Sequence, residues 1–149
     1  MAKRFERPED TAREIKAVNL FISGRPDLKA NKLSPHEIDF SISKDGNNVA
    51  YIEVKGVKKV KSIFDEHTPI VAIKKLTALQ KYINEKKCPN VYIAWAYSDG
   101  IKYCKVTDLV GSLQWGGQFK PRAGSVNDHE LMFVDNGTKF QTKTYHSLT

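Results

Sequence analysis

Two alternating segments around a tight-turn signal limit the folds open to this chain more than any other feature. Residues 38–43 alternate apolar and polar side chains, which is the pattern of a half-buried β-strand. Residues 45–48 read Asp-Gly-Asn-Asn and favour a tight turn. Residues 49–54 then alternate again, so the sequence predicts an antiparallel hairpin. Its apolar face is expected to carry Ile38, Phe40, Ile42, Ala50, Ile52 and Val54.

The other face of the hairpin carries three charged residues, Asp39, Glu53 and Lys55. Because side chains alternate along a strand, Glu53 and Lys55 share a face with Tyr51, and Val54 turns into the core. Asp39 comes directly opposite Glu53 if the connection between the strands holds an odd number of residues. Two carboxylates about 5 Å apart repel each other unless a cation lies between them. These residues therefore predict a cation site.

The chemistry of the three side chains indicates which cation. Ligation by oxygen atoms alone, from carboxylates, a carbonyl and water, suits Mg²⁺ or Mn²⁺ rather than zinc. Lys55 would then orient or deprotonate a water at the metal, or neutralise charge on a phosphate. The competing interpretation is that all three residues are solvated strand residues. We favour the metal site because Glu53 and Lys55 end a strand whose alternate residues are core-forming, after an aspartate at hairpin distance.

The rest of the chain predicts a mixed α/β core. A continuous apolar and aromatic run at residues 91–97 predicts a central strand that is buried on both faces. Apolar residues at helical spacing predict one helix before the hairpin and one after it, which gives the order helix, strand, strand, helix, strand, strand. The expected elements outside the hairpin are helices over 8–22 and 69–87, strands over 91–97 and 101–106, a short helix over 107–113 and a weak strand over 131–134.

Composition limits the class of protein. The 149 residues suffice for one domain with its own core, and the formal net charge is +7. No apolar run approaches the roughly 20 residues that span a bilayer, and no secretory signal pattern opens the chain. Two cysteines are too few for a disulfide framework. We therefore expect a reduced, intracellular (cytoplasmic) protein with no membrane contact. The positive charge alone is weak evidence for a polyanionic partner.

The element order and the charged residues resemble the PD-(D/E)XK nuclease superfamily. Asp39 matches the aspartate of the family pattern, Glu53 and Lys55 match its Glu-x-Lys, and Ile38 stands where the name has proline. The resemblance covers residues 11–106 and is strongest to archaeal Holliday-junction resolvases and small phage-encoded nucleases. It implies a restriction-endonuclease-like α/β fold: a mixed central β-sheet flanked by helices, in the order α-β-β-α-β-β, with an irregular C-terminal extension.

The resemblance also implies a ligand set within one nuclease domain. The metal, Mg²⁺ with Mn²⁺ as a substitute, would be held by Asp39, Glu53 and the Val54 carbonyl, and Lys55 would position the nucleophile. The domain is expected to span residues 1–149, and its parts are a core at 8–110 and an extension at 111–149.

An acidic residue on the first helix completes the family pattern, and two residues compete for this role. Glu14 borders the apolar stripe of the predicted helix, from which it would reach a second metal ion or its water. Glu9 is the alternative, but a glutamate in a first helical turn is already explained by the helix dipole. We therefore favour Glu14.

The implied function is hydrolysis of DNA phosphodiester bonds by a metal-dependent endonuclease, with junctions or branched DNA as a candidate substrate. The alternative is a nucleic-acid-binding module without catalysis on the same fold, and the intact set of Asp39, Glu53 and Lys55 argues against it. The sequence leaves open whether the substrate is DNA or RNA. DNA is the expected partner, together with a second copy of the chain, because resolvases of this type cut two strands as two-fold dimers.

Lysines around the predicted site would contact phosphates without reading sequence. In related nucleases a lysine or glutamine on the second helix supports the active site, and the sequence does not decide between Lys74 and Lys75 for that role. The predicted DNA-contacting residues are Lys58, Lys59, Lys61, Lys74 and Lys75.

Overall fold

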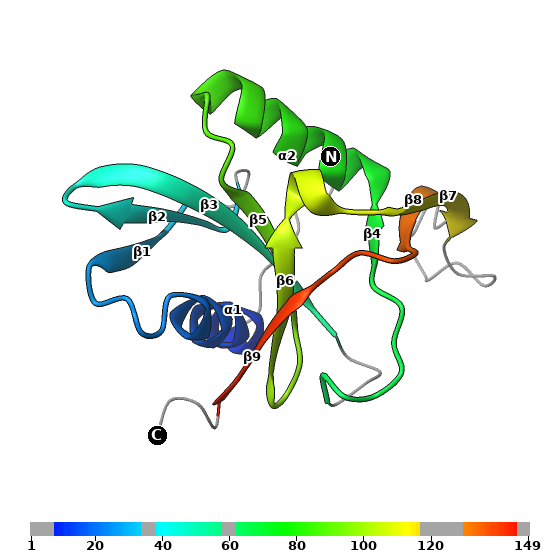
Figure 1. Cartoon of the computed structure of the whole chain (residues 1–149), viewed down its shortest axis with the longest axis horizontal. Coiled ribbons are helices and arrows are strands. Elements are labelled where there is room, and N and C mark those ends of the chain that lie inside the picture. The colour runs from blue at the N-terminus through cyan, green and yellow to red at the C-terminus, as the bar shows by residue number, and fades with distance from the viewer. Residues whose placement is uncertain (1–7, 34–37, 58–61, 117–129, 146–149) are drawn as a thin grey trace.

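The computed structural model describes residues 8–33, 38–57, 62–116 and 130–145, which form two α-helices, a 3₁₀ turn and two β-sheets (Figure 1). Helix α1 spans Pro8–Phe21 and helix α2 spans Ile73–Lys86. The strands are β1 (Leu28–Lys32), β2 (Phe40–Lys44), β3 (Asn47–Gly56), β4 (Ile70–Ala72), β5 (Val91–Ala96), β6 (Gly100–Lys105), β7 (Gly111–Gly116), β8 (Glu130–Asp135) and β9 (Gln141–Thr144).

A six-stranded mixed sheet forms the centre of the molecule, in the order β1-β2-β3-β5-β6-β9. Strands β3 and β5 run parallel, and the other neighbours are antiparallel. Figure 1 shows α1 and α2 on opposite sides of this sheet. Each helix covers an apolar cluster, with Leu79 and Trp95 on the α2 side and Leu20 and Ile52 on the α1 side. The predicted fold class is confirmed, because a mixed sheet lies between two helices, and the helices and strands of the predicted core follow one another in the predicted sequence with additional strands between them.

The turn of the β2–β3 hairpin holds two residues. Asp45 and Gly46 have φ angles of 52° and 81°, the left-handed geometry of a two-residue hairpin turn. An even connection of this kind would not bring Asp39 opposite Glu53. However, the register shifts by one residue between Ile42 and Ser43. This bulge restores the odd connection on which the predicted cation site depends.

Beyond the bulge, Phe40 pairs with Ile52. The same register continued by one residue sets Asp39 opposite Glu53, just where β2 begins. Strand β3 continues past this point and pairs with β5 as far as Gly56. The candidate residues therefore lie at a fork, where β3 has lost its β2 neighbour.

The structure corrects the predicted faces of the hairpin. Tyr51 and Glu53 are expected on a polar face, yet each is only 6% exposed, because α2 covers that side of the sheet. Ile38 is expected on the same face as Phe40 and Ile42. It packs in the α2-side cluster instead, since β2 begins only at Phe40, whereas Phe40 and Ile42 pack in the α1-side cluster.

Three elements differ from the sequence prediction. Strand β1 is missed, because its sequence Leu-Lys-Ala-Asn-Lys lacks β-branched and aromatic residues. Helix α2 begins at Ile73 rather than Pro69, because residues 70–72 pair with β8 as β4. The helix expected over 107–113 is wrong: the structure has a 3₁₀ turn at Val106–Asp108, and β7 follows.

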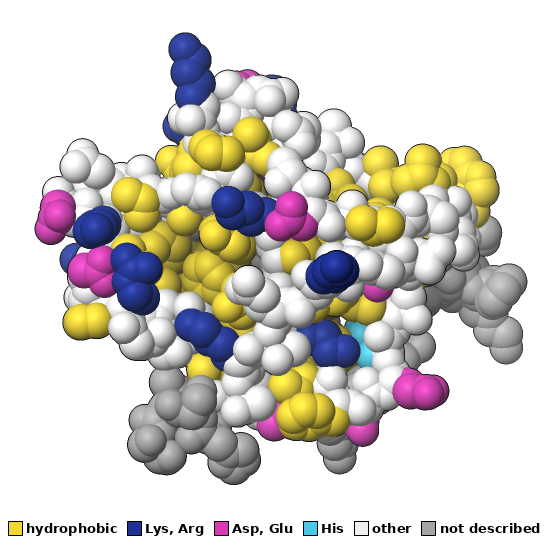
Figure 2. All heavy atoms as spheres, in the orientation of Figure 1, with side chains coloured by type: hydrophobic (Ala, Val, Ile, Leu, Met, Phe, Trp, Pro, Cys, Tyr) yellow, Lys and Arg dark blue, Asp and Glu magenta, His cyan; other side chains and the backbone are white. Residues whose placement is uncertain are grey.

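The segment after residue 110 contains more β-structure than its polar composition predicts. Strand β8 confirms the strand expected at 131–134, and it lies between β4 and β7 in a three-stranded sheet. Strand β9 adds to the free side of β6 in the main sheet. Figure 2 shows hydrophobic side chains gathered over the β7–β8 region, where Leu113 and Trp115 are 61% and 71% exposed.

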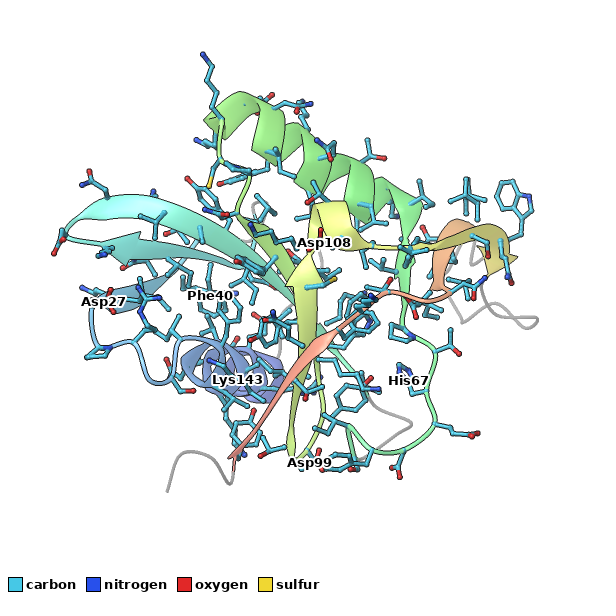
Figure 3. All side chains as sticks on the ribbon, in the orientation of Figure 1. Asp27, Phe40, His67, Asp99, Asp108 and Lys143 are labelled. Atoms are coloured by element: carbon cyan, nitrogen blue, oxygen red, sulfur yellow. The ribbon has the colours of Figure 1, made fainter. Side chains whose placement is uncertain are left out.

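Lys143 on β9 forms hydrogen bonds to the backbone at the C-terminal end of α1. The Lys143 ammonium donates hydrogen bonds to the carbonyl oxygens of Phe21, at 2.7 Å, and Ser23, at 3.3 Å (Figure 3). A cation at a helix C-terminus satisfies open carbonyls and interacts favourably with the helix dipole.

We therefore expect Lys143→Met to lower the free energy of unfolding by about 1–2 kcal/mol, because these carbonyls lose a charged donor. Chemical denaturation followed by circular dichroism measures the effect. The exposed Lys139→Met is the matched control, and equal stability of the two variants would contradict the assigned role.

Candidate active site

The Asp39 carboxylate lies at the fork between β2 and β3. Its Oδ2 atom accepts a hydrogen bond of 2.8 Å from the backbone N–H of Val54, and its side chain is 16% exposed. Asp39 immediately precedes β2, and its own carbonyl accepts a hydrogen bond from the Leu33 N–H at 3.0 Å. The hydrogen bond from Val54 holds the Asp39 carboxylate against the backbone of that residue, which follows Glu53 on β3.

The orientation of the Val54 peptide group follows from the hydrogen bonds of β3. The N–H and C=O of one strand residue point to the same side of the strand. The N–H groups of Tyr51 and Val57 point toward β5, where they donate to Asn90 and Ala96. Because the direction of the N–H groups alternates along a strand, the N–H of Val54 points to the opposite side of β3, toward Asp39. Its carbonyl oxygen therefore also faces the Asp39 side, where β2 pairing has ended.

The Glu53 carboxylate is buried and only half satisfied. Its Oε2 atom lies 3.3 Å from the Lys75 ammonium. Its Oε1 atom is buried without a hydrogen-bond partner, the one such side-chain atom among the described residues. A buried charge without partners costs several kcal/mol. An orphaned carboxylate oxygen in this position is a group that a cation would satisfy.

The surroundings of Glu53 shift its ionisation. The pKa of Glu53 is raised from 4.5 to about 7, chiefly by burial and secondly by the negative charge of Asp39. The ammonium groups of Lys75 and Lys55 oppose this shift. The charges of Asp39, Lys55 and Lys75 therefore all act on the Glu53 carboxyl group.

Helix α2 contributes one lysine to the site. Lys75, which the sequence did not separate from Lys74, is the one that contacts Glu53. Lys74 is 83% exposed and pairs instead with Glu130 at 3.3 Å. The loop lysines predicted at the rim lie outside the described residues: Lys58, Lys59 and Lys61.

A pocket opens beside Glu53, between the hairpin and α2. Its wall combines apolar and charged side chains, and Glu53 lies at the sheet side of it. A polyanionic ligand placed here would meet lysines on α2 and reach Glu53 at the end of β3. The lining residues are Ile38, Glu53, Lys75, Ala78, Leu79, Lys81, Tyr82 and Glu85.

Glu14, predicted as the helical acid, contacts the site through a lysine. Its Oε1 atom accepts a hydrogen bond of 2.7 Å from the Lys32 ammonium. The same ammonium lies 3.7 Å from Asp39 Oδ1. Sequence reasoning missed Lys32 because it missed β1, the strand that carries it. The side chain of the competing candidate, Glu9, lies outside the described residues.

The donor atoms at the fork fit a hard divalent cation. The described residues hold no cluster of three His, Cys, Asp or Glu side chains, so a protein cage of the zinc type is not present in them. The available donors are the carboxylates of Asp39 and Glu53 and the carbonyl of Val54. Mg²⁺ commonly takes one or two carboxylates and keeps several waters, and the orphaned Glu53 oxygen provides such a ligand.

A comparison with protein families adds an independent observation. The family described as "Phage putative PDDEXK endonuclease" matches residues 1–143. The chain belongs to this family. Membership in the phage PDDEXK endonuclease family supports a nuclease function.

Further comparisons place this family member among known proteins. The fold is similar to that of Hjc, a Holliday junction resolvase from the archaeal hyperthermophile Archaeoglobus fulgidus. The two chains share 13% sequence identity, the match covers 84% of this chain and 88% of the other, and the TM-score is 0.48. No curated protein sequence matches the chain. In the described part of the chain, no helix is both long and apolar enough to cross a membrane.

Proposed function

We propose that the chain is a divalent-metal-dependent endonuclease that hydrolyses DNA phosphodiester bonds. The observation that carries this proposal is the buried Glu53 Oε1 atom, which lacks a hydrogen-bond partner in the described structure and lies beside a second carboxylate, that of Asp39. Two neighbouring carboxylates repel each other, and burial of one of them lowers stability further, so such a pair in a folded protein is typical of a cation site. Membership in an endonuclease family supports the same conclusion.

In this proposal Asp39, Glu53 and the Val54 carbonyl hold Mg²⁺, for which Mn²⁺ substitutes. The ion supplies a positive charge at the scissile phosphate and lowers the pKa of the attacking water. Lys55 lies near Glu53, on the same side of β3, and orients that water toward phosphorus. Lys75 holds the Glu53 carboxylate from the side of α2.

DNA is the proposed substrate, and a junction or branched form is the candidate within that class. The net charge of +7 favours a polyanion, and the lysines on α2 line one wall of the pocket beside Glu53. A second copy of the chain is part of the proposal, because a symmetric junction offers two equivalent strands to cut.

Incubation with plasmid, single-stranded, four-way-junction and RNA substrates tests the proposal. We expect cleavage of DNA in Mg²⁺ or Mn²⁺ and no cleavage in excess chelator. Preferred cleavage of the junction would support structure selectivity, while equal cleavage of all DNA forms would contradict the proposed preference for junctions or branched DNA. Binding of DNA without cleavage in either metal would favour the non-catalytic alternative.

A salt titration tests the predicted phosphate contacts. We expect Lys58→Gln, Lys59→Gln and Lys61→Gln each to flatten the slope of log affinity against log salt by roughly 0.7–0.9, because each removes about one released counterion. Affinity is expected to fall similarly for different DNA sequences. Ca²⁺ is used so that the DNA stays intact. The control is Lys86→Gln in the last turn of α2, and a control slope equal to that of the variants would contradict the proposed DNA path.

A further inference from the structure

The ammonium of Lys32 lies between Glu14 and Asp39, two of the three acidic residues to which the resemblance gives a role in metal binding. It is 2.7 Å from Glu14 Oε1 and 3.7 Å from Asp39 Oδ1. It also lies 5.0 Å from the centre of the Phe40 ring. The side chains of Glu14 and Asp39 are 17% and 16% exposed and that of Lys32 is 33% exposed, so the two carboxylates are partly withdrawn from water while the ammonium keeps more contact with it.

The backbone fixes this lysine in place. Lys32 is the last residue of β1 and pairs directly with Phe40, the first residue of β2, so the two side chains lie on the same side of the sheet. Figure 3 shows Phe40 between the hairpin and α1, the helix that carries Glu14. An edge strand, the central hairpin and a helix thus all contribute to one charged cluster.

The two oxygens of Asp39 divide the site into two sides. Oδ1 is the oxygen near the Lys32 ammonium, and Oδ2 accepts the hydrogen bond from Val54 on β3. Glu53 and the Val54 carbonyl belong to the β3 side, where the orphaned Glu53 oxygen lies. Glu14 belongs to the other side, and there a positive charge is already present.

We propose that Lys32 is a positioning residue whose ammonium takes the place of a second divalent ion, so that the active site binds one metal ion per chain. Glu14 then holds Lys32 rather than a metal, and Lys32 fixes Asp39 for the single ion on the β3 side. A second dication between Glu14 and Asp39 would have to lie against this ammonium, and like charges repel strongly in a partly buried site. This inference rests on the proposed metal-dependent function.

Counting bound Mn²⁺ tests the inference without any measurement of activity. Equilibrium dialysis, with free Mn²⁺ followed by electron paramagnetic resonance, is expected to give one ion per wild-type chain. Glu14→Gln is expected to leave that count at one. Lys32→Gln is expected to raise it to two, because Glu14 and Asp39 lose their shared cation. The double variant Lys32→Gln/Glu14→Gln is expected to return to one.

Two control variants separate charge from strand structure. Lys32→Arg keeps a cation at the end of β1 and is expected to bind one ion. Lys29→Gln removes an exposed lysine from the same strand and is expected to leave the count at one.

The possible results distinguish the two proposals. Two ions in the wild-type chain, one of them lost in Glu14→Gln, would overturn the role of Lys32 and leave the nuclease proposal standing. A Lys32→Gln chain that still binds one ion would also overturn that role. Absence of Mn²⁺ binding by the wild-type chain would overturn both proposals.

Discussion

Asp39→Asn, Glu53→Gln and Lys55→Met are each expected to reduce DNA cleavage by at least about a thousandfold. Each substitution removes a single component of the proposed chemistry: a carboxylate ligand in the first two cases, and the group that orients the attacking water in the third. Single-turnover cleavage of a labelled junction in Mg²⁺ measures the loss directly.

The controls for this prediction must separate chemistry from folding and from DNA binding. Each variant is expected to keep the circular dichroism spectrum of the wild-type chain and to bind junction DNA in Ca²⁺. Glu85→Gln is the matched control substitution. Glu85 lines the same pocket, but it pairs with Lys81 and does not lie at the fork between β2 and β3. Full cleavage by any of the three active-site variants would contradict the assignment.

The second large effect concerns stability in the absence of metal. Folding raises the pKa of Glu53 from 4.5 to about 7, chiefly by burial. Between these two pH values the folded chain binds more protons than the unfolded chain, so its stability falls as pH rises. The contribution of protonated Glu53 is fully present below about pH 4.5 and is lost as pH passes through about 7.

Glu53→Gln is therefore expected to be more stable than the metal-free wild-type chain at pH 8, by on the order of 2–3 kcal/mol. The difference is expected to shrink toward zero near pH 4.5, where the wild-type carboxyl is protonated. Urea denaturation at a series of pH values, in the presence of chelator, gives the stability difference at pH 8 and its decrease toward pH 4.5.

Two controls accompany the stability measurement. Glu66→Gln, at an exposed position, is expected to show no such pH-dependent difference. Ca²⁺ at a hundredfold excess over its dissociation constant is expected to stabilise the wild-type chain by about 2.7 kcal/mol at pH 8 and to stabilise Glu53→Gln far less. A metal-free Glu53→Gln that is less stable than wild type at pH 8 would show that the buried carboxylate carries no unfavourable charge.

The sequence could predict the hairpin and its charged residues because local signals determine them. Alternation defines the strands, and Asp45-Gly46 defines the turn. The sequence could not show the bulge between Ile42 and Ser43, since a one-residue shift leaves no clear mark in an alternating pattern. From the sequence alone, the placement of Asp39 opposite Glu53 therefore depended on an odd number of connecting residues. Only the structure shows the bulge that makes this number odd.

The remainder of the site depends on contacts between distant segments. Lys75 and Lys74 are neighbours on α2, and only the packing of that helix on the sheet brings Lys75 to Glu53. Lys32 belongs to an edge strand with weak strand propensity, which is recognisable only through its pairing with β2. The burial of Glu53 was also hidden, because alternation predicts a polar face without saying which element covers it.

Diffraction from crystals soaked in Mn²⁺, recorded near the manganese absorption edge, tests most directly the claim that Asp39 and Glu53 form a metal site. We expect an anomalous peak at the fork between β2 and β3, within about 2.0–2.3 Å of oxygen atoms from Asp39, Glu53 and the Val54 carbonyl. A peak bound elsewhere, with the Glu53 carboxylate still without a cation, would contradict the account.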